Sequence, residues 1–304
     1  MVDYLFVAIG LVGLFLGGDA LVRGAVGIAR RLAMPPLLIG LTVVGFGTSM
    51  PELLVSVQAA LSGSPALAIG NIVGSNIGNI LLIIGLSALV WPITVSGASL
   101  RRDAACMIGA ALVLVPLFWM GWIGRPAGVV LLAVLAAYLV ISYRGAQGAP
   151  SETTGPAAPM WRSLLWLTVG FVALLAGARF LVDGSVNIAR SFGVSEAFIG
   201  LTIVAIGTSL PELATSLIAA LKRHSEIAIG NIVGSNIFNI LGILGLTAII
   251  APIPVEPRFL TFDLPVMIGV TLLFTTLLLM RPAIGRGVGA ALLAGYAAYV
   301  VSAQ

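Results

Sequence analysis

The sequence predicts an all-α integral membrane protein of about ten transmembrane helices, arranged as two five-helix repeats of inverted topology. Three observations predict this fold: the composition, the length of the apolar blocks and an internal repeat. Of the 304 residues, 60% are hydrophobic and only 9% are charged, against about 25% charge in an average globular protein. The apolar blocks are roughly 20 residues long, which is the length a helix needs to cross a bilayer. Their Leu, Ala, Gly and Ile content favours helices over a β-barrel.

Charged or Pro/Gly-rich breaks separate ten expected spans. These are residues 4–28, 37–61, 67–90, 104–122, 127–143, 163–188, 197–221, 227–250, 263–280 and 287–302. The first block lacks the basic start and cleavage site of a signal peptide, so we expect it to be a retained span. Residues 144–162 are rich in Gly, Pro, Ser and Thr, which predicts a linker between a first repeat (1–143) and a second (163–304).

An internal repeat is the strongest organising feature of the chain. Adding 160 to a residue number carries residues 40–61 onto 200–221 with 14 of 22 positions identical, and 68–86 onto 228–246 with 16 of 19 identical. Because each repeat holds an odd number of spans, the second copy must enter the membrane upside down. Inverted repeats of this kind are typical of secondary transporters, whose sites lie near the bilayer midplane where broken helices meet.

The basic residues predict the orientation. With the N-terminus outside, eleven of them fall on the cytoplasmic side: Arg23, Arg30, Arg31, Arg101, Arg102, Arg144, Arg162, Lys222, Arg223, Arg281 and Arg286. The other side receives only Arg125, Arg179, Arg190 and Arg258. Both termini are therefore expected to be extracytoplasmic and the 144–162 linker cytoplasmic. The net charge of +4 is too small and too spread for a nucleic-acid partner, and the lone Cys106 excludes a disulfide framework.

Two glutamates are expected deep in the membrane, at equivalent positions of the repeat. Residues 47–56 read GTSMPELLVS and residues 207–216 read GTSLPELATS, with Glu52 and Glu212 in the two copies. A charged side chain at this depth costs several kcal/mol and is a functional-site candidate by default. No Lys or Arg lies in the middle of any predicted span, so a salt bridge is disfavoured. Two facing glutamates can both stay ionised only with a cation between them, and carboxylates suit calcium.

A proline precedes each glutamate. Pro51 and Pro211 have no N–H for the carbonyl one turn earlier, so each helix should break there and leave backbone oxygens free. Free carbonyls at membrane depth are tolerated where they line a cavity or meet a ligand. The adjacent hydroxyls add further oxygens; they belong to Thr48, Ser49, Thr208 and Ser209.

A second motif, GNIVGSNIGNI at residues 70–80, is repeated as GNIVGSNIFNI at residues 230–240. Asn71, Ser75 and Asn79 recur every four residues and share one helical face, as do Asn231, Ser235 and Asn239. These neutral oxygens suit sodium or orient the glutamates. The glycines at 70, 74 and 78 have the spacing that lets membrane helices approach closely, and packing or function explains them equally well.

Other charged groups fit local roles. Asp19 with Arg23, and Arg179 with Asp183, are spaced i, i+4 and can form ion pairs near helix ends. They favour a structural or gate-stabilising role. His224 reads as a solvated loop residue.

At the two repeated motifs the chain resembles the sodium/calcium exchanger family of the calcium:cation antiporters, in its compact prokaryotic form. The resemblance implies that calcium is bound by Glu52 and Glu212 with the backbone oxygens of Thr48 and Thr208. It also implies sodium contacts from the two glutamates, which sodium shares with calcium, from the backbone of Gly45 and Ala205, and from four serines: Ser49, Ser75, Ser209 and Ser235. The polar centre is implied to consist of Asn79 and Asn239. Some potassium-dependent members carry an acid at the position of Asn239, which is Asn here.

The expected mechanism is alternating access, in which calcium or sodium neutralises the two carboxylates and only an occupied site reorients. Helices 4–28 and 163–188 are candidates for a sliding gate. The partners expected are the lipid bilayer of a prokaryotic inner membrane, Ca²⁺ and Na⁺, with neither a cofactor nor an obligate protein partner. Three alternatives stay open: proton/calcium exchange, a channel, and an intramembrane enzyme with a carboxylate pair.

Overall fold

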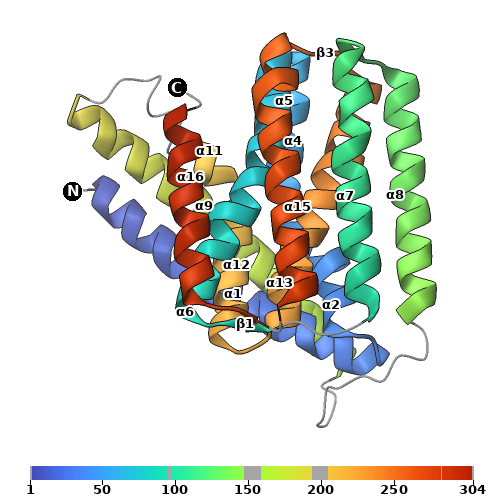
Figure 1. Cartoon of the computed structure of the whole chain (residues 1–304). Helices are drawn as coiled ribbons and strands as arrows, with labels where there is room; N and C mark the ends of the chain where they lie inside the picture. The colour runs from blue at the N-terminus through green and yellow to red at the C-terminus, as the bar shows by residue number, and fades with distance from the viewer. Residues whose placement is uncertain (1, 95–97, 147–158, 194–204, 282, 303–304) are drawn as a thin grey trace.

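The computed structural model describes residues 2–94, 98–146, 159–193, 205–281 and 283–302, and Figure 1 shows their arrangement. Residues 147–158 of the predicted linker and 197–204 of the seventh predicted span lie outside the described residues. The helical elements of the first half are α1 (Val2–Leu32), α2 (Pro36–Ile39), η1 (Gly40–Val44), α3 (Gly45–Thr48), α4 (Met50–Leu61), α5 (Pro65–Gly78), η2 (Asn79–Ile84), α6 (Gly85–Val90), α7 (Ala98–Trp119) and α8 (Arg125–Ala146). Those of the second half are α9 (Met160–Ser191), α11 (Ala205–Thr208), α12 (Leu210–Leu221), α13 (Ser225–Ile237), η4 (Phe238–Leu244), α14 (Gly245–Ile250), η5 (Phe259–Asp263), α15 (Leu264–Met280) and α16 (Arg286–Ser302).

The fold is helical and built to cross a membrane. Among the described residues, seven helices are long and apolar enough to span a bilayer, or eight when the bent pair Pro36–Thr48 and Met50–Leu61 is counted as one span. The η segments are π-helical turns inside or beside longer helices, a distortion that is frequent at functional sites. The sequence did not predict them.

Two spans form the centre of the molecule. Within the apolar 18-residue stretch of each span, 78% of the residues are buried in Pro65–Val90 and 83% in Ser225–Ile250. In the other five spans the buried share is 39% or less. These central spans contain the two copies of the second motif. The motif is therefore surrounded by protein on nearly all sides, which is where a polar stripe can persist at membrane depth.

The helices α1 and α9 pack against each other through glycines spaced seven residues apart. A Cβ on Gly17 would lie 2.7 Å from the backbone nitrogen of Leu174, and one on Gly170 would lie 2.5 Å from that of Leu21. Real side chains never approach a backbone so closely, so the two helices are in contact only because these residues lack a side chain. The same contact recurs at the remaining members of the two series, which are Gly10, Gly24, Gly177 and Gly184.

Two short antiparallel strand pairs join the halves, a detail that the all-α prediction lacks. Strand β1 (Ile93–Thr94) pairs with β4 (Ala283–Ile284), and β2 (Trp122–Ile123) pairs with β3 (Ile253–Pro254). The labels of β1 and β3 lie at opposite ends of the bundle in Figure 1. Because β1 and β3 are equivalent in the repeat (93 + 160 = 253), equivalent segments of the two halves lie at opposite ends.

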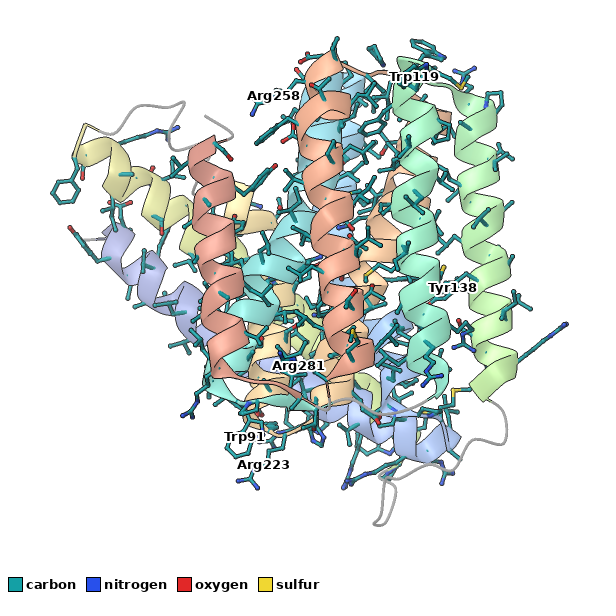
Figure 2. All side chains as sticks on the ribbon, in the orientation of Figure 1. Trp91, Trp119, Tyr138, Arg223, Arg258 and Arg281 are labelled. Atoms are coloured by element: carbon teal, nitrogen blue, oxygen red, sulfur yellow. The ribbon has the colours of Figure 1, made fainter. Side chains whose placement is uncertain are left out.

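Cationic and aromatic residues mark both ends of the bundle (Figure 2). Arg223, whose guanidinium lies 4.4 Å from the ring of Trp91, is at the same end as Arg281. Trp119 and Arg258 are at the other end. Tryptophan and arginine at these positions are typical of membrane–water interfaces. The separation of Arg258 from the other two arginines agrees with the sides predicted for them.

Candidate ion-binding site

The helix breaks predicted at the prolines are present. The segments on the two sides of Ser49 are bent by 43°, and Ser49 itself has φ −82° and ψ 10°. Ser209 occupies the equivalent break, with φ −90° and ψ 9°. Each proline lies in the first turn of the helix that follows, where its missing N–H costs nothing. Each glutamate therefore lies in the first turn of a helix, where the positive end of the helix dipole favours a carboxylate.

The two glutamates are buried and each is held by the other half of the chain. Glu52 and Glu212 are both 1% exposed. Ser209 donates a hydrogen bond of 2.8 Å to Oε1 of Glu52, and Ser49 donates one of 2.8 Å to Oε1 of Glu212. The structure thus brings together the central residues of the two copies of the first motif.

Asn71 joins the first glutamate to the central span. Its Nδ2 donates to the backbone oxygen of Glu52 at 3.1 Å and to Oγ of Ser56 at 2.9 Å. The α4 helix is thereby fixed to α5 beside the carboxylate. Ser56 received no role in the sequence analysis, although its preservation in the repeat four residues after the glutamate was a usable signal.

Asn231 does the same in the second half and makes one more contact. Its Nδ2 donates to the backbone oxygen of Glu212 at 3.2 Å and to Oγ of Ser216 at 2.9 Å. Its Oδ1 accepts a hydrogen bond of 3.0 Å from the hydroxyl of Thr48. Asn231 is fully buried, so it connects elements of both halves within the protein interior.

The serines of the second motif lie against the broken helices. The hydroxyl of Ser235 donates to the backbone oxygen of Gly45 at 3.2 Å, and that of Ser209 lies 3.4 Å from that of Ser75. Thr208 ends α11, which begins at Ala205, so the backbones of these two residues occupy the turn before the second break. The predicted oxygen donors therefore gather around the two breaks.

The asparagines are placed at the centre, with two partners that the sequence analysis overlooked. Asn79 donates to Oδ1 of Asn236 at 2.9 Å, and Asn236 in turn donates to the backbone oxygen of Asn76 at 3.4 Å. Asn76 and Asn236 occur in both copies of GNIVGSNI, a repetition that could have identified them. Asn239 is buried as well, at 1% exposed.

Several buried polar atoms of this site have no hydrogen-bond partner among the described residues. They are Oε2 of Glu52, Oε2 of Glu212, Oδ1 of Asn79, and both Oδ1 and Nδ2 of Asn239. Neither glutamate forms an ion pair with a described Lys or Arg. A buried polar atom without a partner costs about 1–3 kcal/mol, and more when it is charged. Carboxylates with free oxygens and neutral oxygen donors beside them are the types of ligand that hard cations prefer.

The glycines of the second motif differ between the two halves. A Cβ on Gly74 would meet no described atom within 4 Å, and one on Gly70 would meet only the ring edge of Phe259 at 3.8 Å. In contrast, a Cβ on Gly230 would lie 2.6 Å from the carbonyl oxygen of Leu37. Close helix packing therefore explains the glycine in the second copy, but it is not found around the first copy in the described part of the chain.

The charged groups outside the centre fall partly as predicted. Asp19 pairs with Arg23 at 2.7 Å, and Arg179 pairs with Asp183 at 3.7 Å. Asp19 also forms an unpredicted ion pair with Lys222, which follows α12. His224 precedes α13 in a short turn, but it is half-buried rather than solvated.

Comparison with known proteins agrees with this geometry. The chain is 40% identical over 300 residues to Inner membrane protein YrbG of Escherichia coli, which covers 95% of this chain and 92% of that protein. It is 30% identical over 347 residues to Sodium/calcium exchanger MaX1 of Methanosarcina acetivorans, covering 99% and 98% of the two chains. A solved structure of the sodium-calcium exchanger NCX_Mj matches it with a TM-score of 0.88 at 33% identity, over 100% of this chain and 99% of that one.

A family model described as "Sodium/calcium exchanger protein" matches residues 2–144 and 162–303, which is nearly the whole chain. The matched regions contain both broken helices and both central spans. Members of this family are transporters rather than enzymes. The chain belongs to the sodium/calcium exchanger family.

Proposed function

We propose that the protein is a secondary active antiporter that exchanges Ca²⁺ for Na⁺ across a prokaryotic inner membrane by alternating access. The observation that carries this proposal is the pair of crossed hydrogen bonds, in which a serine of each half holds the glutamate of the other half. Both carboxylates keep one oxygen without a partner among the described residues. The relatives YrbG and MaX1 are named as an inner membrane protein and a sodium/calcium exchanger, which agrees with the location and the ions.

The proposed calcium site uses six oxygens. Four come from the carboxylates of Glu52 and Glu212, and two come from the backbone carbonyls of Thr48 and Thr208. Calcium takes about 6–8 oxygen ligands in proteins, so this set meets the lower end of its requirement. The two charges of the ion balance the two carboxylates, which allows the occupied site to move through a low-dielectric barrier.

The proposed sodium sites share the glutamates and add neutral oxygens. We assign them the hydroxyls of Ser49, Ser75, Ser209 and Ser235, with backbone oxygens of Gly45 and Ala205. Asn79 and Asn239 orient the centre. The contact of Ser235 with the carbonyl of Gly45 brings two of these donors together. Because both ions need the same carboxylates, the sites for calcium and sodium cannot be filled independently, which couples the two fluxes.

The proposed topology has ten spans in two inverted five-helix repeats, residues 1–143 and 163–304, joined by a cytoplasmic linker at 144–162. Beyond the seven long apolar helices, three further segments complete the count: the bent pair from Pro36 to Leu61, the segment that ends with Leu210–Leu221, and Arg286–Ser302. The opposite placement of the equivalent strands β1 and β3 supports the inversion. Because glycines of both helices let the backbones of α1 and α9 approach closely along their length, we assign these two helices the role of a sliding gate.

Liposomes containing the purified protein test the exchange. Vesicles loaded with Na⁺ should take up Ca²⁺ from outside, and vesicles loaded with K⁺ or with an acidic interior should not. Glu52→Gln and Glu212→Gln should each abolish the uptake, whereas Glu256→Gln should not, because that side chain is exposed. Uptake that follows the pH gradient and ignores Na⁺ would identify a proton/calcium exchanger instead. Uptake driven by the Ca²⁺ gradient alone, without any counter-ion, would identify a channel.

A further inference from the structure

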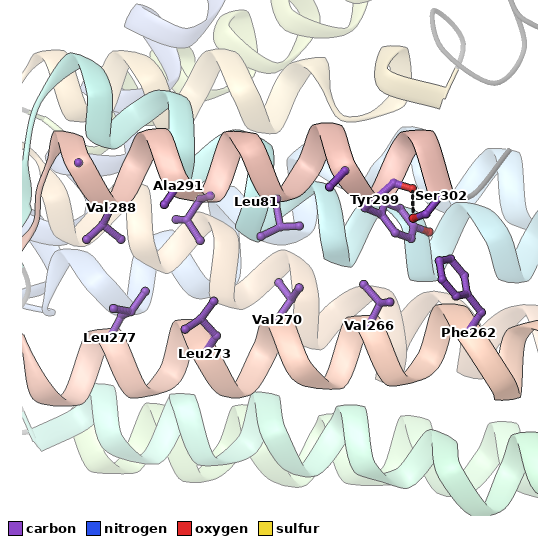
Figure 3. Close-up of a pocket in the computed structure, with 14 residues that line it drawn as sticks. Leu81, Phe262, Val266, Val270, Leu273, Leu277, Val288, Ala291, Tyr299 and Ser302 are labelled. Atoms are coloured by element: carbon purple, nitrogen blue, oxygen red, sulfur yellow. Dashed lines mark hydrogen bonds between the residues drawn. The ribbon is translucent and has the colours of Figure 1, made fainter.

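A groove with a volume of about 720 Å³ runs along the outer surface between α15 and α16. Figure 3 shows its two walls and the side chains that line it. The wall on α15 consists of branched apolar residues such as Val270 and Leu273, while Leu81 of η2 lies between the two helices. The helix α16 packs on α6 and η2, and α15 packs on α7 and α5. The space between α15 and α16 is therefore not filled by the packing of either helix.

The wall on α16 includes a row of small residues. Gly287, Ala291 and Gly295 recur every four residues along it. In a membrane protein such a stripe usually receives a neighbouring helix. Here no described residue of α15 lies within 4 Å of a Cβ placed on Gly287 or Gly295. A Cβ on Gly295 would meet only the side chain of Leu81, at 3.7 Å.

The groove is long enough for an extended acyl chain. From Gly287 to Ser302 the groove is about 22 Å long at 1.5 Å per residue, which exceeds the ~15 Å of hydrocarbon in one leaflet.

The charges at its two ends differ. At the Leu277 and Gly287 end lie Arg281 and Arg286, both exposed, and Figure 2 shows Arg281 at the lower end of the bundle. The Nε of Arg286 donates a hydrogen bond of 3.0 Å to the backbone oxygen of Leu89, which fixes this side chain at the end of the groove. At the other end, Asp263 accepts a hydrogen bond of 3.0 Å from the hydroxyl of Tyr299 and lies 3.6 Å from Arg258, so that end carries an acid and a base together. A phosphate group is therefore attracted to the end with the two arginines.

From the length of the groove, its apolar walls and the one-sided charge, we propose that it is a binding site for an anionic diacyl phospholipid. Its two acyl chains lie between α15 and α16, and its phosphate group lies at Arg281 and Arg286. This site is separate from the ion-binding centre and does not depend on which cations the protein exchanges.

Native mass spectrometry of the full chain tests the proposal, using protein equilibrated in micelles with equal amounts of phosphatidylglycerol and phosphatidylethanolamine. Wild-type protein should retain one phosphatidylglycerol per chain in preference to phosphatidylethanolamine. Ala291→Phe places a ring in the groove and should reduce retention several-fold. Ala294→Phe is the matched control, because Ala294 is exposed on the same helix and does not line the groove.

The headgroup is tested by a surface substitution that leaves the helices intact. Arg281→Gln should lower the preference for phosphatidylglycerol about fivefold, the effect expected for one basic residue near a membrane surface. Arg258→Gln at the other end should leave the preference unchanged. Equal retention of the two lipids by wild-type protein, or equal losses in the two Phe variants, would overturn the proposal. A dimer that is disrupted by Ala291→Phe would also overturn it, because a second copy would then occupy the groove.

Discussion

The two asparagines that hold the glutamate helices permit a quantitative comparison. Asn71 makes two side-chain hydrogen bonds to α4, whereas Asn231 makes two to α12 and accepts a third from Thr48. A hydrogen bond between membrane helices contributes about 0.6 kcal/mol on average. Asn71→Ala should therefore destabilise the protein by about 1.2 kcal/mol and Asn231→Ala by about 1.8 kcal/mol. The difference of about 0.6 kcal/mol is close to a threefold change in the unfolding equilibrium.

The measurement is the free energy of unfolding in mixed micelles, combined with the Ca²⁺ concentration for half-maximal uptake. Both variants should require more Ca²⁺, because the backbone next to each glutamate is no longer fixed. Ser87→Ala is the control, since Ser87 is as buried as Asn231 but its hydroxyl has no described partner. In a Thr48→Val background the difference between Asn71→Ala and Asn231→Ala should disappear.

Two results would refute this reasoning. The first is a loss for Asn71→Ala that equals or exceeds the loss for Asn231→Ala in the wild-type background. The second is a half-saturating Ca²⁺ concentration in both variants that is no different from that of Ser87→Ala. Either would mean that the asparagines fill space in the interior without positioning the glutamates.

Three further predictions concern the periphery of the site. Asp19→Asn removes the ion pair with Lys222 that joins α1 to the end of α12, and the pair with Arg23 within α1. Uptake should slow more than in Asp183→Asn, whose side chain is half-exposed, and equal rates would contradict this. Gly170→Ala should destabilise the protein by about 1–3 kcal/mol, because the added Cβ forces α1 and α9 apart. Gly109→Ala is the control and should not destabilise it, since a Cβ there meets no described atom within 4 Å. The midpoints of thermal unfolding of the two variants test this difference. Burial and two nearby cations lower the pKa of His224 below its ordinary 6.5, so the unfolded chain binds the proton more readily and stability falls as pH drops below about 6.5. The slope of the unfolding midpoint against pH should flatten in His224→Gln, and an unchanged slope would contradict it.

The sequence predicted the broken helices and their carboxylates because each follows from a local property. A proline without an N–H breaks the helix wherever it stands, as at Pro51, and the cost of a buried charge identifies Glu52 without any knowledge of its neighbours. The repeat then predicted the second copy at Glu212. These features needed only the one-dimensional pattern.

Contacts between the halves could not be read from that pattern. Ser49 donates its hydrogen bond to Glu212, although Glu52 is nearer in the sequence. The choice depends on how the two halves pack together, and the local motif is compatible with either partner. The π-helical turn at Asn79 leaves no mark in composition, since it needs only one additional residue in a turn. The seven-residue spacing of Gly10, Gly17 and Gly24 is present in the sequence and could have predicted close helix packing. The prediction considered only the four-residue spacing of the glycines at 70, 74 and 78.

The crossed serine contacts have a consequence for how a cation is received. A serine hydroxyl has one proton and two lone pairs. At Ser49 and Ser209 that proton is directed to a carboxylate of the opposite half, so only lone pairs remain for an incoming ion. A cation on the serine oxygen polarises its O–H bond and strengthens the bond to the carboxylate. In the sodium sites proposed above, occupancy would therefore tighten the link between the two halves, and an emptied site would loosen it.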